Sequence, residues 1–194
     1  MLGIIPGRKA RVDSRHAATD GEIVRAVLAG DIELYSVLVE RHRDRFARYA
    51  VRMLGSRDAA EDAVQDALVR AFDHLADCRE PDKFAGWLFL ILRNRCFAEQ
   101  RRHQREGRLP EEAAGAVAAP DRSDGAVERR ERDVALQRAV GELTPEQREV
   151  LVLKHVEELP YEEIAQITGA TVASLKMRMH RAYDRLRELM KEHA

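Results

Sequence analysis

Basic side chains near the carboxyl end are the residues whose types and spacing point most directly to a chemical role. They recur through a predicted helix over residues 171–187, and they are Lys176, Arg178, His180, Arg181 and Arg185. A helix that carries cations on its outer face can contact phosphates and base edges in the major groove of DNA. This pattern therefore favours nucleic-acid binding over the alternative, a helical hairpin with a solvated charged face.

The residues before this helix predict the turn that would position it. Pro160 is suited to a helix start, and Gly169 to the positive φ of a helix end. Thr171 is a good N-cap for the second helix. Apolar residues on both helices recur at helical spacing, and they are Ile164, Ala165, Ile167, Val172, Leu175 and Met179. Residues 159–181 therefore predict a helix-turn-helix.

Composition limits the classes of protein that the chain can belong to. Its 194 residues allow one or two domains, and 35% charged with only 5% aromatic residues favours helices over a sheet. The net charge is −1, so contacts with nucleic acid must come from local patches. One such patch is Arg93, Arg95, Arg101, Arg102 and Arg105, which is interrupted by a single acid, Glu99.

The amino-terminal segment and the cysteines exclude other classes. Residues 1–15 hold no apolar run long enough for a signal peptide or membrane span, which predicts a cytoplasmic protein without membrane insertion. Cys78 and Cys96 are too few for a disulfide framework, and no C-x-x-C or H-E-x-x-H occurs. We therefore expect two ordinary cysteines, no metal and no cofactor.

Apolar periodicity in the first half predicts four helices, beginning near Asp20, Leu34, Ser56 and Phe84. We expect Asp58 and Glu61 to form a capping box after Ser56, and Pro81 to break the chain into a mobile loop over 77–83. The side chains of Asp62, Gln65 and Asp66 share one face of the third helix. They are either a solvated face or an acidic docking surface for a basic partner. Asn94 and the neighbouring arginines, beside the loop, suit single-stranded or melted DNA.

The sequence thus predicts an all-α protein of two small helical domains joined by a flexible linker. We expect a disordered basic tail over 1–18, a first domain over 19–105, a linker over 106–129 and a second domain over 130–194. Thr144 to Gln147 form a strong helix start, with a threonine cap and Pro145 at the first position. That helix is expected to pack on the helix-turn-helix.

Several segments resemble a known family. Residues 41–45 (RHRDR), 58–66 (DAAEDAVQD) and 84–94 (FAGWLFLILRN) resemble region 2 of sigma factors. Residues 143–150 (LTPEQREV) and the helix-turn-helix resemble region 4. The pattern is similar to the extracytoplasmic-function group of the sigma-70 family of bacterial RNA polymerase subunits.

This resemblance implies a binding role without catalysis, and with neither cofactor nor metal. Core RNA polymerase would be bound through its β′ coiled coil by Asp62, Gln65 and Asp66, and through its β flap by the second domain. Promoter DNA would be contacted at the −35 element by Thr171, Ser174, Lys176, Met177, Arg178, His180 and Arg181. The −10 element would be contacted and melted by Asp77, Arg79, Lys83, Phe84, Arg93, Asn94, Arg101 and Arg102. An anti-sigma factor is a further expected partner.

Two other functions are possible alternatives, and the sequence departs from the family pattern at two places. A freestanding helix-turn-helix regulator would leave segments 58–66 and 84–102 without a role. A nucleic-acid enzyme would need a convergent His, Cys or carboxylate cluster, and the sequence shows none. Leu159-Pro160 stands where the family usually has a serine or threonine cap. Met177 stands where a small polar residue often contacts a base, so it would contact a thymine methyl or simply pack.

Overall fold

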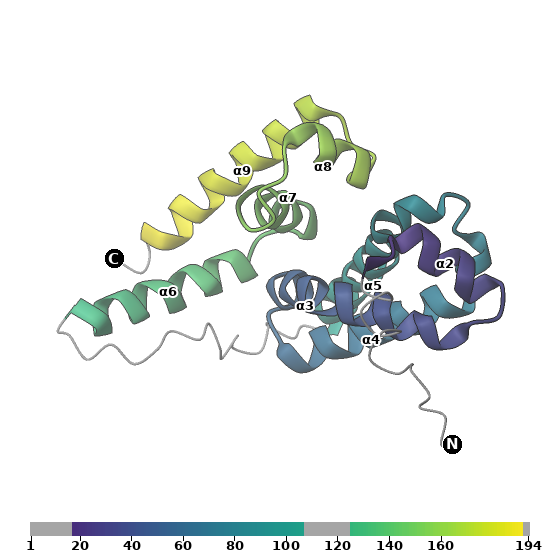
Figure 1. Cartoon of the computed structure of the whole chain (residues 1–194). Coiled ribbons are helices and arrows are strands. Elements are labelled where there is room, and N and C mark those ends of the chain that lie inside the picture. The colour runs from purple at the N-terminus through teal and green to yellow at the C-terminus, as the bar shows by residue number, and fades with distance from the viewer. Residues whose placement is uncertain (1–16, 107–124, 192–194) are drawn as a thin grey trace, which may run out of the picture.

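The computed structural model describes residues 17–106 and 125–191, which form helices joined by turns (Figure 1). These ranges contain no strand, which confirms the predicted all-α class. The first sixteen residues of the predicted tail and residues 107–124 of the predicted linker lie outside the described residues.

The first half packs three long helices against one another and adds a short one. The short helix is α2 (Asp20–Leu28), and the long ones are α3 (Tyr35–Leu54), α4 (Arg57–Asp73) and α5 (Phe84–Glu106). Short 3₁₀ turns η1 (Ile32–Leu34), η2 (Leu75–Asp77) and η3 (Pro81–Lys83) connect them. Their apolar faces form a core that includes Leu38, Tyr49, Met53, Ala67, Leu88 and Leu92.

Local sequence sets where these helices begin and end. The Thr19 side chain accepts from the Glu22 N–H, and the Glu22 carboxylate accepts from the Thr19 N–H, which is a capping box. α3 ends where Gly55 adopts a φ of 72°. The capping box expected from Asp58 and Glu61 is wrong, because the Ser56 hydroxyl itself caps α4 by accepting from the Ala59 N–H at 3.3 Å.

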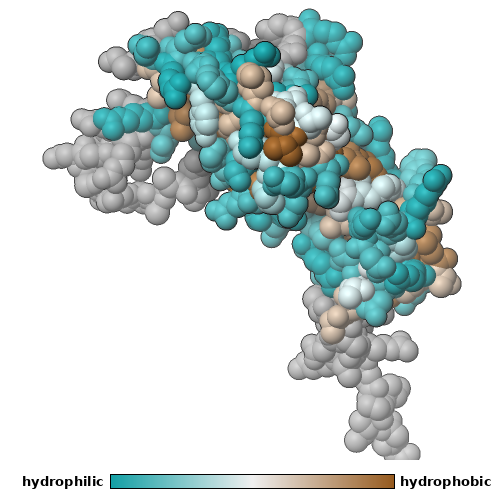
Figure 2. Space-filling view, turned by 90° about the horizontal axis from the view of Figure 1, so that it is seen from above, coloured by the Kyte–Doolittle hydropathy of each residue, from teal (hydrophilic) through white to brown (hydrophobic). Residues whose placement is uncertain are grey.

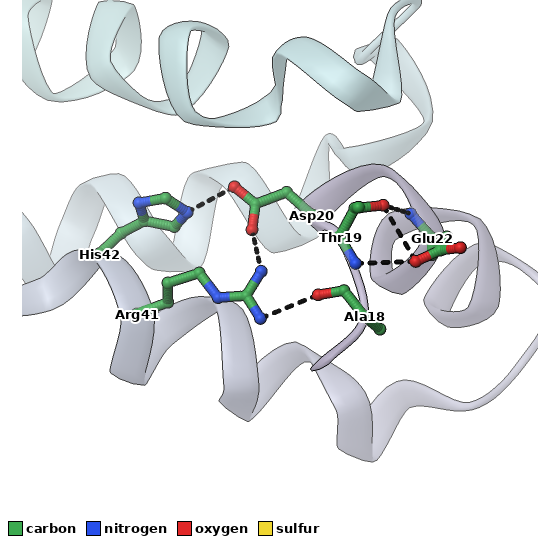
Figure 3. Close-up of polar contacts among 6 residues, drawn as sticks. All are labelled: Ala18, Thr19, Asp20, Glu22, Arg41 and His42. Carbon is green, nitrogen blue, oxygen red and sulfur yellow. Dashed lines mark hydrogen bonds and ion pairs between the residues drawn. The ribbon is translucent and has the colours of Figure 1, made fainter. Parts of the chain in front are cut away.

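Contacts made by the start of α2 fasten it to α3 (Figure 3). The Asp20 carboxylate accepts from the Arg41 guanidinium at 2.5 Å, and its other oxygen lies 2.7 Å from Nε2 of His42. A second Arg41 nitrogen donates to the Ala18 carbonyl at 3.0 Å. The first part of the 41–45 segment therefore holds α2 in place.

The second half comprises α6 (Gly125–Gly141), α7 (Pro145–His155), α8 (Tyr161–Thr168) and α9 (Val172–Lys191). α6 begins five residues before the predicted end of the linker, so the residues from Gly125 onward are helical. Thr144 and Gln147 form the expected capping box at the start of α7. α6 and α7 both pack on α9.

The two halves are in direct contact. α7 packs on α3 (Figure 1), and one continuous cluster of buried apolar residues includes side chains from both halves. Phe89, Leu92 and Phe97 belong to this cluster together with Val150, Val152 and Leu153. The sequence predicted two tethered domains and did not predict this interface.

Candidate nucleic-acid interface

The predicted helix-turn-helix is present as α8, a tight corner and α9. Gly169 ends α8 with a φ of 70°, and the Thr171 hydroxyl accepts from the Ser174 N–H at 3.2 Å. Pro160 is the N-cap of α8 and supplies no side-chain acceptor there. The side chains of Leu175, Met179 and Ala182 are buried, so α9 presents its opposite face outward.

The seven residues predicted to contact the −35 element lie on a broad outer face of α9. Thr171, Lys176, Met177, His180 and Arg181 are exposed, whereas Ser174 and Arg178 are half-buried. Successive residues advance by about 100° around a helix, so Lys176 and His180 lie toward one edge and Arg178 and Arg181 toward the other. Met177, 55% exposed, lies between the two edges.

Neighbouring side chains support the edge that holds Lys176. The Lys176 ammonium lies 5.9 Å from the centre of the Tyr161 ring. Nδ1 of His180 lies 2.7 Å from the Asp184 carboxylate, and the hydroxyl of Tyr183 lies 2.6 Å from Nε2 of His155 on α7. Asp184 therefore offsets part of the positive charge on this edge.

We expect Lys176→Ala and Arg181→Ala each to weaken binding to the upstream promoter element by about 1–3 kcal/mol if they contact bases. Both side chains are exposed on α9, so their loss removes contacts without disturbing the core. Fluorescence anisotropy with duplex DNA measures the change. Arg187→Ala is a matched control, because this exposed arginine pairs with Asp184 at 3.0 Å. Unchanged affinity in both variants would show that this helix does not bind in the major groove.

On α4, two of the three residues predicted to bind polymerase are exposed, and the third is held by ion pairs. Asp62 and Gln65 face outward. The Asp66 carboxylate is half-buried and lies 3.0 Å from Nε of Arg95 and 3.2 Å from Nε of Arg70. Asp66 thus joins α4 to α5 and is less exposed than Asp62 and Gln65.

Segment 77–83 is a defined turn packed on α2, which makes the expectation of a mobile loop wrong. The Asp82 carboxylate pairs with Arg25 of α2 at 2.7 Å. A Cβ on Gly21 would lie 1.9 Å from a side-chain oxygen of Asp82, so a larger residue there would displace the Asp82 carboxylate. Asp77, Arg79 and Lys83 remain exposed on the turn, where Lys83 pairs with Glu80 at 2.6 Å.

The predicted contact of Phe84 with the −10 element is wrong for this arrangement. Its side chain has 0% exposure and packs near the rings of His42 and Trp87. A base cannot reach the ring unless the core opens. Its position at the first residue of α5 makes it a packing residue that anchors the turn.

The polar residues of α5 point in different directions. Asn94 and Arg101 are exposed. Arg102 pairs with Glu99 on its own helix, and Arg93 pairs with Glu149 of α7. At 1.5 Å per residue, Asn94 lies about 15 Å along α5 from the turn that precedes it. The turn and Asn94 are therefore separate parts of one surface.

Sequence reasoning missed the charged residues that are buried. Glu149 is 1% exposed and Arg148 6% exposed, and the sequence patterns suggested no role for either. One signal was present, because Glu149 falls at helical spacing with Val152, Leu153 and Val156 and so lies on an apolar face. A charge at such a position must find a partner inside the fold.

Both cysteines are core residues. Burial raises the pKa of Cys96 to about 12 and also raises the pKa of Cys78, so both thiols stay protonated near neutral pH. Within residues 17–106 and 125–191, no three His, Cys, Asp or Glu side chains converge as metal ligands would. In the same ranges no helix has the length and apolar character to cross a membrane.

Comparison with protein families identifies two matching regions. The family described as Sigma-70 region 2 matches residues 38–106, and the family described as Sigma-70, region 4 matches residues 133–186. The first match spans most of α3 through α5, and the second covers the end of α6, α7, α8 and most of α9.

Relatives match over most of the chain. It is 29% identical to the ECF RNA polymerase sigma factor SigW of Bacillus subtilis, over 87% of this chain and 95% of that protein. It is 31% identical to the RNA polymerase sigma factor CarQ of Myxococcus xanthus, over 84% and 92%. Among solved structures, RpoE of Bartonella quintana in complex with the anti-sigma factor NepR aligns with a TM-score of 0.60 at 26% identity, over 81% and 96%. CnrH in complex with the cytosolic domain of CnrY aligns with a TM-score of 0.62 at 26% identity, over 90% and 99%.

Proposed function

Because this chain belongs to the extracytoplasmic-function group of the sigma-70 family of RNA polymerase sigma factors, we propose that its exposed helix faces divide promoter recognition between them. The outer face of α9 contacts the −35 element through the residues around Met177. The turn 77–83 and the exposed side of α5 contact the −10 element. The outer face of α4, with Asp62 and Gln65, contacts the polymerase β′ coiled coil, and the second half contacts the β flap.

The observation that carries this assignment is the exposed face of α9, which an N-capped helix start and a glycine corner set at a fixed angle to α8. A helix with a buried apolar side and an outer side rich in lysine and arginine matches the geometry of a major-groove recognition helix. Polymerase supplies the catalysis, and this chain supplies position. Its place of action is the cytoplasm, where core polymerase and the promoter are found.

An anti-sigma factor is also part of the proposal. Two of the aligned structures are complexes, one of RpoE with the anti-sigma factor NepR and one of CnrH with the cytosolic domain of CnrY. Because the chain aligns over most of RpoE, a partner of the same class as NepR can bind the faces that polymerase would otherwise contact. Co-purification with core polymerase in the presence and absence of such a partner measures the competition.

Run-off transcription with core polymerase and a promoter library tests the function as a whole. The expected result is transcript only when this chain is added, from promoters that share two elements at a fixed separation. Transcript that is independent of the chain, or binding to DNA without binding to polymerase, would instead indicate a freestanding regulator.

Substitutions on α5 test the proposed division between base contacts and phosphate contacts. Asn94 can both donate to and accept from a base edge, so Asn94→Ala should mainly reduce promoter opening. Arg101 is exposed and suited to binding phosphates. Arg101→Ala should therefore weaken binding to all DNA sequences about equally and reduce the salt dependence of that binding. Permanganate footprinting measures opening. If the promoter opened normally after replacement of Asn94 and the exposed residues of turn 77–83, other residues would have to melt the DNA.

A further inference from the structure

The contact between the two halves contains charged side chains that are withdrawn from water. The Glu149 carboxylate of α7 accepts two hydrogen bonds from the Arg93 guanidinium of α5, one of them at 2.9 Å. The Tyr49 hydroxyl of α3 lies 3.5 Å from the same carboxylate, at the outer limit for a hydrogen bond. Glu149 is 1% exposed and Tyr49 fully buried, so this cluster lies in the interior of the contact.

The charges in this cluster are matched. Burial raises the pKa of Tyr49 well above its usual value, with Glu149 adding to the rise, so the phenol stays neutral and can donate. Burial by itself would lower the pKa of Arg93, but Glu149 outweighs that effect and the pKa is raised. Arg93 is therefore a cation whose counter-ion is supplied by the other half of the chain.

Two further contacts extend across the same boundary. The Arg148 guanidinium donates to the Met53 carbonyl at the end of α3, and Gln100 of α5 donates to that carbonyl too. At the edge, Nε of Arg45 lies 2.9 Å from the Glu157 carboxylate. Arg45 is the last residue of the 41–45 segment, for which the sequence suggested no specific role.

These contacts occupy a residue that the proposed function needs elsewhere. Arg93 was assigned to the −10 element, where a guanidinium would bind a phosphate. In the structure its guanidinium binds a carboxylate, which presents an anionic pair of oxygens to the same nitrogens. Glu149 thus takes the place that a phosphate would take.

We propose that Glu149 is an intramolecular latch that holds the two halves closed and keeps Arg93 from DNA until polymerase and promoter separate them. The part of this proposal that concerns DNA rests on the proposed function. The part that concerns closure does not, because it depends only on the contact between α7 and the α3–α5 surface. Lys176 and Arg181 remain exposed in the closed form, so closure restricts the −10 side and leaves the −35 side accessible.

Charge reversal of the full chain tests closure directly. In Glu149→Arg two arginines face each other, and small-angle X-ray scattering should show a shift to a larger radius of gyration. Asp133→Arg is the matched control, since it makes the same charge change at an exposed position of α6 in the second half and should leave the radius unchanged. The exchange Arg93→Glu with Glu149→Arg should restore the smaller radius. A wild-type radius in Glu149→Arg, with native circular dichroism, would overturn the latch.

Binding to DNA gives the second measurement. If the open form is populated at about 1–10% in the wild type, its release lowers the apparent Kd for single-stranded −10 DNA about 10–100-fold. Glu149→Arg should show this gain beyond any gain in Asp133→Arg, while affinity for the −35 duplex stays equal in the two variants. If Glu149→Arg had a larger radius of gyration but no gain in affinity for DNA, Glu149 would still hold the halves closed, and the role of Arg93 in DNA binding would be rejected.

A reversible crosslink covers the case in which Glu149→Arg fails to fold. Arg45→Cys with Glu157→Cys places two thiols opposite each other across the contact, where the Arg45 side chain is 48% exposed and that of Glu157 9% exposed. The native Cys78 and Cys96 are buried. A short cleavable bis-maleimide should hold the chain closed, abolish promoter opening with polymerase, and permit it again after cleavage. Equal promoter opening before and after cleavage would overturn the latch.

Discussion

Replacing Asp62 by lysine is expected to abolish association with core polymerase and leave the fold intact. Asp62 is exposed on α4 and lies outside the core, so reversal of its charge changes the surface alone. A carboxylate that faces basic groups of a partner becomes a repulsive contact when its sign is reversed, which costs several kcal/mol at an interface. Analytical size exclusion with core polymerase measures the loss of complex.

Asp66→Lys is also expected to weaken association with polymerase, but here the substitution changes the fold as well as the surface. A lysine there would face Arg95 and Arg70 in place of their counter-ion, so thermal stability should fall as well. Asp73→Lys is the control for Asp62→Lys, since Asp73 is an exposed acid at the other end of the same helix. Retained complex formation by Asp62→Lys, with a native circular dichroism spectrum, would make the acids of α4 a solvated face only.

Replacing Arg148 by methionine is expected to lower the free energy of unfolding by about 1–3 kcal/mol. The guanidinium donates to three carbonyls, those of Met53, Val140 and Gly141, which lie at the ends of α3 and α6. Gln100 still donates to the Met53 carbonyl and the Leu143 N–H to the Val140 carbonyl, so the Gly141 carbonyl is the acceptor that loses its donor. An unsatisfied buried acceptor costs about 1–3 kcal/mol. Methionine retains most of the length of the side chain and removes every donor.

Urea unfolding followed by circular dichroism measures this loss. Burial lowers the pKa of Arg148 to about 10, so the guanidinium is still charged at neutral pH and donates fully there. The control is Arg187→Met, whose side chain is exposed and pairs with Asp184 at 3.0 Å. It should change stability by less than about 0.5 kcal/mol. Equal stability of the two variants would show that water replaces Arg148 at the helix ends.

The sequence was sufficient for the features that short segments encode. Thr144 and Thr171 each cap the helix that follows, and Gly169 ends the helix before it. The apolar spacing of α9 correctly separated Leu175 and Met179 from the outer face. Capping and periodicity depend on neighbours within about one turn, so they can be derived before any tertiary contact is known.

Partners distant in the sequence decided the rest. Phe84, Asp66 and Arg93 all looked like surface contacts, and their different fates follow from what packs beside each one: the core, Arg95 and Glu149. The turn 77–83 contains a helix-breaking Pro81, yet α2 holds it through Arg25 and the space left by Gly21.

Sequence alone determined that this chain is an all-α protein with a basic helix-turn-helix and an acidic helix, in the order typical of sigma factors. Only the tertiary structure decided which of those charges face solvent and which face each other. The physical reason is that burial makes a charge depend on its partner, and Arg93 and Glu149 are separated by more than fifty residues of chain. No local pattern predicts a pair of that kind, because the fold must bring the two halves together before either charge has a counter-ion.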